Sequence, residues 1–112
     1  HKAGYLYGLA QFIINQYGSV QQLAREPLPR LRQEFLNLKG IGPETADSIL
    51  LYALDKPVFV IDEYTRRLVK QKKITRNLSY HHLQELFEKN LRKDYKLYQD
   101  FHALIVIDGK NH

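Results

Sequence analysis

The chain has 112 residues, enough for one domain with one hydrophobic core, and 44% of them are hydrophobic, as in ordinary soluble proteins. Its longest runs of apolar residues other than tyrosine, Val58–Ile61 and Ala103–Ile107, are far too short to span a membrane, and the lack of cysteine excludes disulfides and thiolate metal sites within these residues. The net charge of +5 favours a polyanionic partner such as nucleic acid, although a merely soluble basic protein is equally compatible with it. We expect an intracellular protein, cytoplasmic or nucleoid-associated, with no membrane contact.

The first part of the chain predicts three helices. A first helix has apolar residues at three- and four-residue spacing, at Tyr5, Leu6, Leu9, Phe12, Ile13, Tyr17 and Val20. Gly18 is expected to end this helix, and Ser19 can cap a short helix over Val20–Arg25. After a turn at Pro27 and Pro29, a third helix of about three turns has its apolar stripe at Leu31, Phe35 and Leu38.

A two-glycine turn, Lys39–Gly40–Ile41–Gly42, separates this helix from the next. Two glycines one residue apart permit a tight turn with positive φ angles. Pro43 suits the first position of a new helix, because its missing N–H is not needed there. Lys56–Pro57 ends that helix, whose buried residues are expected at Ala46, Ile49, Leu50 and Ala53.

The remainder predicts a connector followed by three helices. Val58–Ile61 is apolar and extended but too short and isolated for a sheet, so we expect it to be a buried connector. Asp62 can cap a helix over Glu63–Lys70. Ser79 can cap a further helix with its stripe at Leu83, Leu86, Phe87 and Leu91. Asp94, or a residue near it, opens a last helix that carries Tyr98, Phe101, Leu104 and Ile105. The prediction is therefore an all-α chain forming one domain over residues 1–112.

Six basic residues gather in Arg66–Arg76. They suit DNA phosphates, but a solvated helix face explains such a run equally well. The histidines predict no metal site, because His81 and His82 are adjacent and point to different sides of a helix, while His1 and His112 lie at the ends.

The two-glycine turn has a physical use beyond changing the direction of the chain. Glycine allows the backbone to approach another group closely, and the amides that open the following helix have no partner within it. Those amides lie at the positive end of the helix dipole and suit a DNA phosphate, whatever the base sequence. An ordinary helix–turn–helix corner is the alternative explanation of the same spacing.

The segment Leu36–Ala46, LNLKGIGPETA, resembles the helix–hairpin–helix motif of the superfamily that contains endonuclease III and the alkylbase DNA glycosylases. The resemblance continues through SILLYAL, DKP and VFVI to Asp62, which lies 20 residues after Gly42, and through EYTRRL beyond it. It also includes the opening KAGYLYGLAQFI, so it spans nearly the whole chain and is most specific over Leu36–Leu68. It implies a helical glycosylase domain of the HhH-GPD type with its hairpin motif at about residues 31–54, acting on double-stranded DNA.

The resemblance also implies roles for individual residues. The carbonyls of Leu36, Leu38 and Ile41 would hold a monovalent cation that bridges to a phosphate. The backbone amides of Gly40, Gly42, Glu44 and Thr45 would face DNA phosphates. Lys39 and Arg66 are further candidate phosphate contacts on their charge alone, and each is equally explained as a solvated charge. Asp62 would be the catalytic acid of the family.

A carboxylate beneath the sugar stabilises the positive charge that develops when an N-glycosidic bond breaks, and it can orient the attacking water. Asp62 is a candidate for this role, while its alternative role as a helix cap can coexist with it. Bifunctional relatives carry a Schiff-base lysine two residues after the second hairpin glycine, where this chain has Glu44. The resemblance therefore implies a monofunctional glycosylase that uses water, with alkylated purines as the expected substrates.

A base flipped out of the duplex needs an aromatic pocket, for which the candidates are Tyr5, Tyr7, Tyr52 and Tyr64. Members of the family are about twice as long as this chain, so we expect N-terminal helices before it and, in the parent protein, a possible iron–sulfur loop (4Fe–4S) beyond residue 112. No cofactor is expected within the chain itself, and protein partners are not predicted. Three rivals stay open: a bifunctional glycosylase/lyase, a non-catalytic helix–hairpin–helix DNA-binding module, and a plain helical interaction domain.

Overall fold

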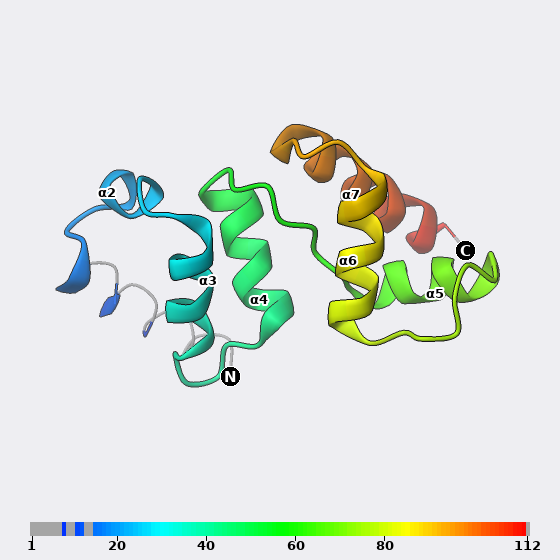
Figure 1. Cartoon of the computed structure of the whole chain (residues 1–112), viewed down its shortest axis with the longest axis horizontal. Helices are drawn as coiled ribbons and strands as arrows, with labels where there is room; N and C mark the ends of the chain where they lie inside the picture. Colours follow the sequence, from blue (N-terminus) through cyan, green and yellow to red (C-terminus); the bar gives the residue numbers. More distant parts are fainter. Residues whose placement is uncertain (1–7, 9–10, 13–14, 112) are drawn as a thin grey trace. The chain divides into compact units, whose positions relative to one another are not determined.

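The computed structural model describes residue 8, residues 11–12 and residues 15–111, and every regular element within them is helical (Figure 1). The predicted all-α fold class is thereby confirmed. The chain divides into two compact units, His1–Asp55 and Lys56–His112. In the part that the structure describes, no helix is both long enough and apolar enough to cross a membrane. Four residues of the first predicted stripe, Tyr5, Leu6, Leu9 and Ile13, lie outside the described residues.

The first unit contains α2 (Val20–Ala24), α3 (Leu28–Leu36), α4 (Pro43–Ser48) and η1 (Ile49–Ala53). Gly18 precedes α2 with a φ of +80°, and the Ser19 hydroxyl accepts a hydrogen bond from the Gln22 amide at 3.2 Å, as the predicted cap requires. On α3, Leu31 and Phe35 are fully buried and form the expected stripe. This helix ends at Leu36, so Leu38 lies beyond it and is only half-buried.

The helix after the hairpin changes its winding midway. It begins as α4 and continues as η1, a π-helical turn in which the Leu54 amide donates to the Ile49 carbonyl five residues back. This wider turn shifts the buried face: Ala46 and Leu50 are buried as predicted, but so are Leu51 and Leu54. The prediction that Ala53 is buried is wrong, because an unbroken 3.6-residue period does not hold across the wider turn.

The second unit contains the connector, α5 (Glu63–Gln71), α6 (Tyr80–Asn90) and α7 (Tyr95–Lys110). Helices α5 and α7 pack against each other. Gly109 of α7 lies so close to α5 that an added Cβ would be 2.3 Å from Cδ1 of Tyr64. The α7 residues that face inward include Tyr98, His102, Ile105 and Gly109, at a regular helical spacing. Phe101, a member of the predicted stripe, also packs inward, with its ring edge-on to Phe59 and Phe87.

That face differs from the predicted stripe on α7. Tyr98 and Ile105 are buried as expected, whereas Leu104 is 65% exposed, so its assignment to the core is wrong. The predicted buried face of α7 was assigned from its apolar residues alone. The packed line on the helix instead passes through a histidine and a glycine, and Leu104 lies off it.

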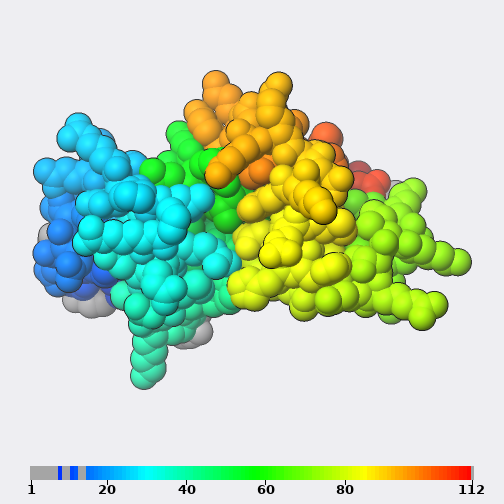
Figure 2. Space-filling view, viewed as in Figure 1, coloured from blue at the N-terminus to red at the C-terminus, as the bar shows by residue number. Residues whose placement is uncertain are grey.

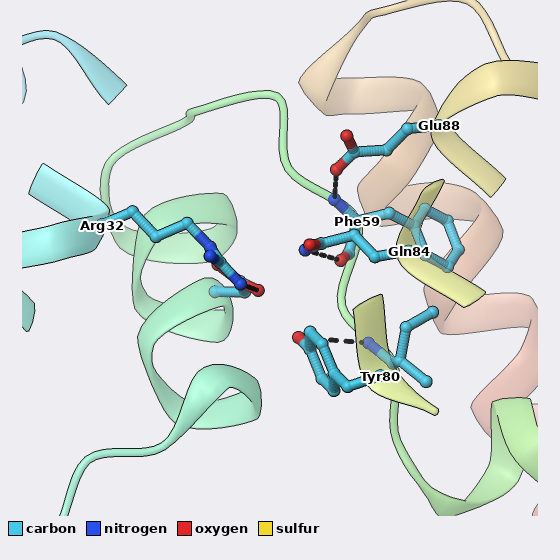
Figure 3. Close-up of polar contacts among 7 residues, drawn as sticks. Arg32, Phe59, Tyr80, Gln84 and Glu88 are labelled. Atoms are coloured by element: carbon cyan, nitrogen blue, oxygen red, sulfur yellow. Dashed lines mark hydrogen bonds and ion pairs between the residues drawn. The ribbon is translucent and has the colours of Figure 1, made fainter. Parts of the chain in front are cut away.

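The connector Val58–Ile61 is buried and extended, as predicted, and α6 satisfies its backbone (Figure 3). The Phe59 amide donates to Oε2 of Glu88 at 2.9 Å, and Nε2 of Gln84 donates to the Phe59 carbonyl at 2.9 Å. The Ile61 amide donates to the Tyr80 hydroxyl at 3.4 Å. The side chains of one helix thus replace the neighbouring strand that a buried extended segment would otherwise need.

Candidate functional site

The hairpin lies in the first unit, between the end of α3 and the start of α4. The Leu38 amide donates to the Phe35 carbonyl at 3.0 Å, and the Ile41 amide donates to the Leu38 carbonyl at 3.2 Å, which closes the turn. Gly40 has a φ of +84°, a conformation that favours glycine. Gly42 has a φ of −96° in extended backbone, so only the first of the two glycines uses a positive φ.

The predicted DNA-contact residues of the hairpin all lie at the surface. Helix α4 begins at Pro43, as expected, and the Ala46 amide donates to the Gly42 carbonyl at 2.9 Å. The amides just inside the first turn have no acceptor within the helix, which is the general property on which the phosphate-binding prediction depends. The exposed residues are Lys39, Gly40, Gly42, Glu44 and Thr45.

An ion pair joins the two helices of the hairpin. The Arg32 guanidinium of α3 donates to both carboxylate oxygens of Asp47 on α4, with Nε–Oδ1 at 2.8 Å and Nη2–Oδ2 at 3.1 Å. The Asp47 side chain is fully buried, and that of Arg32 is 22% exposed. Such two-pronged contacts fix geometry as well as charge, so this pair holds the turn between two braced helices.

The three carbonyls expected to hold a cation lie along the same turn. Leu36 is the last residue of α3, Leu38 follows it, and Ile41 is buried just before α4. The Leu38 carbonyl already accepts the Ile41 amide, which leaves it a second lone pair. Neutral carbonyl oxygens are suitable ligands for a monovalent cation, so the donor set fits the expected ion. Elsewhere in the described part of the chain, no cluster of histidine and acidic side chains can hold a metal ion.

Asp62 lies in the second unit, between the buried connector and α5. It caps the helix as predicted: Oδ1 accepts the Thr65 amide at 2.9 Å and the Thr65 hydroxyl at 3.0 Å. The side chain is only 14% exposed. The local sequence explains this placement, because an aspartate that follows an apolar run and precedes a helix stays at the edge of the core.

The other carboxylate oxygen of Asp62 has a partner that the sequence did not indicate. Nε2 of His102, on α7, lies 2.8 Å from Oδ2 of Asp62, and the His102 side chain is 12% exposed. Because a carboxylate only accepts hydrogen bonds, Nε2 is the donor. The spacing of His102 with Tyr98 and Ile105 could have placed it on the buried face of α7. No local pattern pairs it with a residue 40 positions earlier.

These contacts set the charge state of Asp62. Burial raises the pKa of the carboxyl group, but the hydrogen bonds from His102 and Thr65, together with the charge interaction with His102, outweigh it. The net pKa lies below its ordinary value, so the group is a carboxylate at neutral pH. The second unit therefore presents an oriented, largely buried anion.

The basic run Arg66–Arg76 divides into two parts. Nε of Arg66 donates to the Leu78 carbonyl at 3.2 Å, so Arg66 already has a structural contact, and Arg67 lies over the Tyr64 ring at 4.8 Å. The segment that follows α5 projects long side chains outward (Figure 2). An open cavity of about 670 Å³ lies there, lined by Lys70, Lys73, Ile74, Thr75, Arg76 and Leu78.

The tyrosines expected to form a base pocket have different surroundings. Tyr5 and Tyr7 lie outside the described residues. Tyr52 is 44% exposed. Tyr64 packs against Gly109 and beneath Arg67, and the cavity that it lines is about 30 Å³, room for water but not for a purine.

Comparisons with known proteins link these features to DNA repair, although no family model matches the chain. A putative DNA repair glycosylase of Methanocaldococcus jannaschii is 44% identical over 108 residues, which cover 94% of this chain and 49% of that protein. The recombination protein RecR of Lactobacillus delbrueckii subsp. bulgaricus is 40% identical over 53 residues, which cover 47% of this chain and 27% of that protein.

A solved structure gives the same result for the fold. The crystal structure of the H. pylori 3-methyladenine DNA glycosylase MagIII, bound to 1,N6-ethenoadenine, matches with a TM-score of 0.84 at 33% identity, over 98% of this chain and 56% of that one. The chain thus spans about half the length of the two glycosylases that it matches. A sequence match to one DNA glycosylase and a structural match to another support the resemblance of this chain to the helix–hairpin–helix superfamily of DNA glycosylases.

Proposed function

We propose that this chain is part of a base-excision DNA glycosylase, which hydrolyses the N-glycosidic bond of a damaged base in double-stranded DNA. The observation that carries the proposal is the Asp62 carboxylate, largely buried at the start of α5 and kept ionised by Thr65 and His102. The two similar glycosylases, which include a DNA repair protein and a 3-methyladenine enzyme, support it.

The chemistry assigns Asp62 an electrostatic role. As the base leaves, positive charge builds on the deoxyribose, and a fixed carboxylate stabilises that charge more in the transition state than in the ground state. The same carboxylate can orient the water that attacks the sugar. Little reorganisation is needed, because hydrogen bonds already hold both oxygens of Asp62.

The hairpin supplies the DNA grip in this proposal. Lys39 and the backbone at Gly40, Gly42, Glu44 and Thr45 contact phosphates, and a monovalent cation held by the carbonyls of Leu36, Leu38 and Ile41 neutralises phosphate charge. The exposure of the contact residues in the turn supports these roles. Arg66 adds a phosphate contact from the second unit through the part of its guanidinium that does not bond to Leu78.

We further propose that the enzyme is monofunctional and acts on alkylated purines. Glu44 occupies the position where a Schiff-base lysine would stand, and a carboxylate cannot form that adduct. Alkylated purines carry a positive charge that makes them good leaving groups, so they suit an enzyme that relies on a carboxylate and water. The similarity to a 3-methyladenine glycosylase supports this substrate class.

The substitution Asp62→Asn tests the proposal in the intact protein. Asparagine keeps the shape and capping ability of aspartate but removes its charge. We expect single-turnover base release from alkylated duplex DNA to fall by at least about 100-fold, with DNA affinity changed less than about threefold. Unchanged base release by the variant would exclude Asp62 as the catalytic acid.

Two further measurements separate the rivals. Borohydride treatment traps a Schiff base as a covalent protein–DNA adduct, so a trapped adduct would show a bifunctional enzyme and contradict the role given to Glu44. A non-catalytic DNA-binding module is a second candidate, favoured by the similarity of about half of the chain to a recombination protein. Salt-dependent DNA binding by the wild type, without release of any base in a panel of alkylated and deaminated duplexes, would support that candidate.

A further inference from the structure

The contact between His102 and Asp62 is not explained by the packing of the second unit alone. The two residues lie 40 positions apart, on α7 and at the start of α5, and their side chains are 12% and 14% exposed. A histidine on the packed face of α7 needs a polar partner, but a backbone carbonyl or a water molecule would satisfy it equally well. The partner found here is the one carboxylate to which the proposed function assigns the chemistry.

Capping of α5 does not require this contact either. Oδ1 of Asp62 alone receives both the Thr65 amide and the Thr65 hydroxyl, which completes the cap. Oδ2 is thereby left for another use, and Nε2 of His102 occupies it at 2.8 Å. The terminal torsion of an aspartate is soft, so a single anchor at Oδ1 leaves the carboxylate plane free to turn. Anchors on both oxygens hold that plane in one orientation.

His102 is itself held in place. The Phe59 ring of the connector meets the imidazole edge-on, with centroids 6.4 Å apart. Phe59 in turn stacks on Phe87 of α6 at 4.7 Å and meets Tyr98 of α7 edge-on at 5.6 Å. The imidazole therefore forms a rigid link between the aromatic core of the second unit and the carboxylate.

We propose that His102 is a positioning residue of the glycosylase reaction, which holds Oδ2 of Asp62 so that the carboxylate faces the deoxyribose in a fixed orientation. This inference rests on the proposed function and deepens it. His102 acts through Asp62 and does not itself exchange a proton with substrate or water, because its Nε2–H is directed at the carboxylate.

Loss of the histidine also has a predictable electrostatic effect. Burial raises the pKa of Asp62, and without His102 only the Thr65 bonds oppose it, so the pKa rises. Besides His102, the titratable groups on α6 and α7 that are buried in this core or bond to the connector are Tyr98 on α7 and Tyr80 and Glu88 on α6. The last two bond to the connector backbone rather than to Asp62. Since the reaction needs the carboxylate, the acid limb of the rate profile then moves to higher pH.

The experiment compares two substitutions in the intact protein. His102→Phe keeps a ring but removes the donor, whereas His102→Gln keeps an N–H donor without imidazole acid–base chemistry. We expect His102→Phe to lower the single-turnover rate of base release by about 10- to 100-fold, with DNA affinity unchanged and the acid limb at higher pH. His102→Gln should restore most of the rate. The matched control is His82→Gln, because His82 is half-buried on α6 and contacts Thr75 rather than Asp62, with Nε2 3.3 Å from Oγ1.

The rates of the His102 variants and of the wild type lead to three different conclusions. A His102→Phe rate equal to that of the wild type would overturn the inference while leaving the proposed function intact, provided that Asp62→Asn is inactive. Equal losses in His102→Phe and His102→Gln, with both variants melting at the wild-type temperature, would assign proton transfer to His102 and overturn a purely positioning role. Absence of base release by the wild type would overturn the proposed function and this inference together.

Discussion

Asp62 combines two physical roles that different substitutions separate. As a cap it stabilises α5 through Oδ1, and as an anion it presents charge to a substrate. Asparagine caps helices about as well as aspartate, whereas alanine does not, and the loss of a cap costs about 1 kcal/mol. We therefore expect Asp62→Asn, which loses the charge but keeps the cap, to lose less unfolding free energy at neutral pH than Asp62→Ala, which loses both and should lose about 1–2 kcal/mol.

The pH dependence of this stability has a defined sign. Because the folded-state pKa of Asp62 lies below its ordinary value of 3.8, the ionised carboxylate stabilises the folded chain. The contribution is fully present above that ordinary value and is lost as the pH falls through the folded-state pKa. Chemical unfolding between about pH 7 and pH 3 should show the gap between wild type and Asp62→Ala closing at the acid end. A gap that stays constant over this range would contradict the assigned pKa direction.

At the level of elements, the two hairpin glycines have different reasons to be glycine. Gly40 has a φ of +84°, so an added Cβ introduces backbone strain of about 1–2 kcal/mol. Gly42 has an ordinary φ, and a Cβ built on it meets nothing within 4 Å. The fold therefore does not require glycine at position 42. Close approach to a phosphate is the reason that the proposed function supplies.

This difference gives a test of the hairpin. We expect Gly42→Ala to leave the unfolding temperature nearly unchanged but to weaken DNA binding by about tenfold, which corresponds to about 1.4 kcal/mol. Gly40→Ala should lower stability as well as affinity. The control is Gly8→Ala, where an added Cβ also meets nothing within 4 Å. If Gly42→Ala binds duplex DNA as tightly as the wild type in fluorescence titrations, the backbone at position 42 does not approach a phosphate.

Sequence reasoning succeeded where local rules determine the structure. The caps at Ser19, Asp62 and Asp94, the helix start at Pro43 and the buried connector all depend on neighbouring residues. It failed where tertiary packing decides. The π-turn of η1 buries Leu51 and Leu54 instead of Ala53, and no single-residue preference announces such a turn.

The same limit applies to the candidate site. Asp62 and the hairpin could be predicted because their motifs are contiguous in sequence. His102 was missed because its partner comes from another helix, and the Arg32–Asp47 pair was missed for the same reason. Leu104 was misplaced because apolar character alone was used to draw the buried face of α7.

For the molecule as a whole, the positive charge makes a measurable prediction. Lys70, Lys73 and Arg76 line one open cavity, and their sequence alone does not decide between DNA contact and solvated surface. If these residues bind phosphates, replacing all three by glutamine should make the slope of log affinity against log salt less negative. The expected change is about one for each phosphate that is no longer neutralised.

A second triple variant serves as the control for net charge. Lys89 on α6, Lys93 in the segment that follows it and Lys96 on α7 are all exposed. Replacing them by glutamine removes an equal number of positive charges from another part of the surface. Equal changes in the salt slope for both triples would show that the run acts only through net charge. A change confined to the first triple would identify it as a DNA-binding surface.

The bonds between α6 and the connector restrict how the second unit tolerates changes in chain length. Tyr80 bonds to Ile61, and Gln84, four residues later on the helix, bonds to Phe59, two residues earlier on the connector. Four residues of helix rise about 6 Å and two residues of extended chain span about 6.6 Å, so the two spacings agree. Inserting or deleting one residue within α6 would rotate the later partners by about 100° and leave buried backbone groups unsatisfied. Variation in length is therefore expected in the segment between α5 and α6, and not inside the helix that aligns the backbone leading to Asp62.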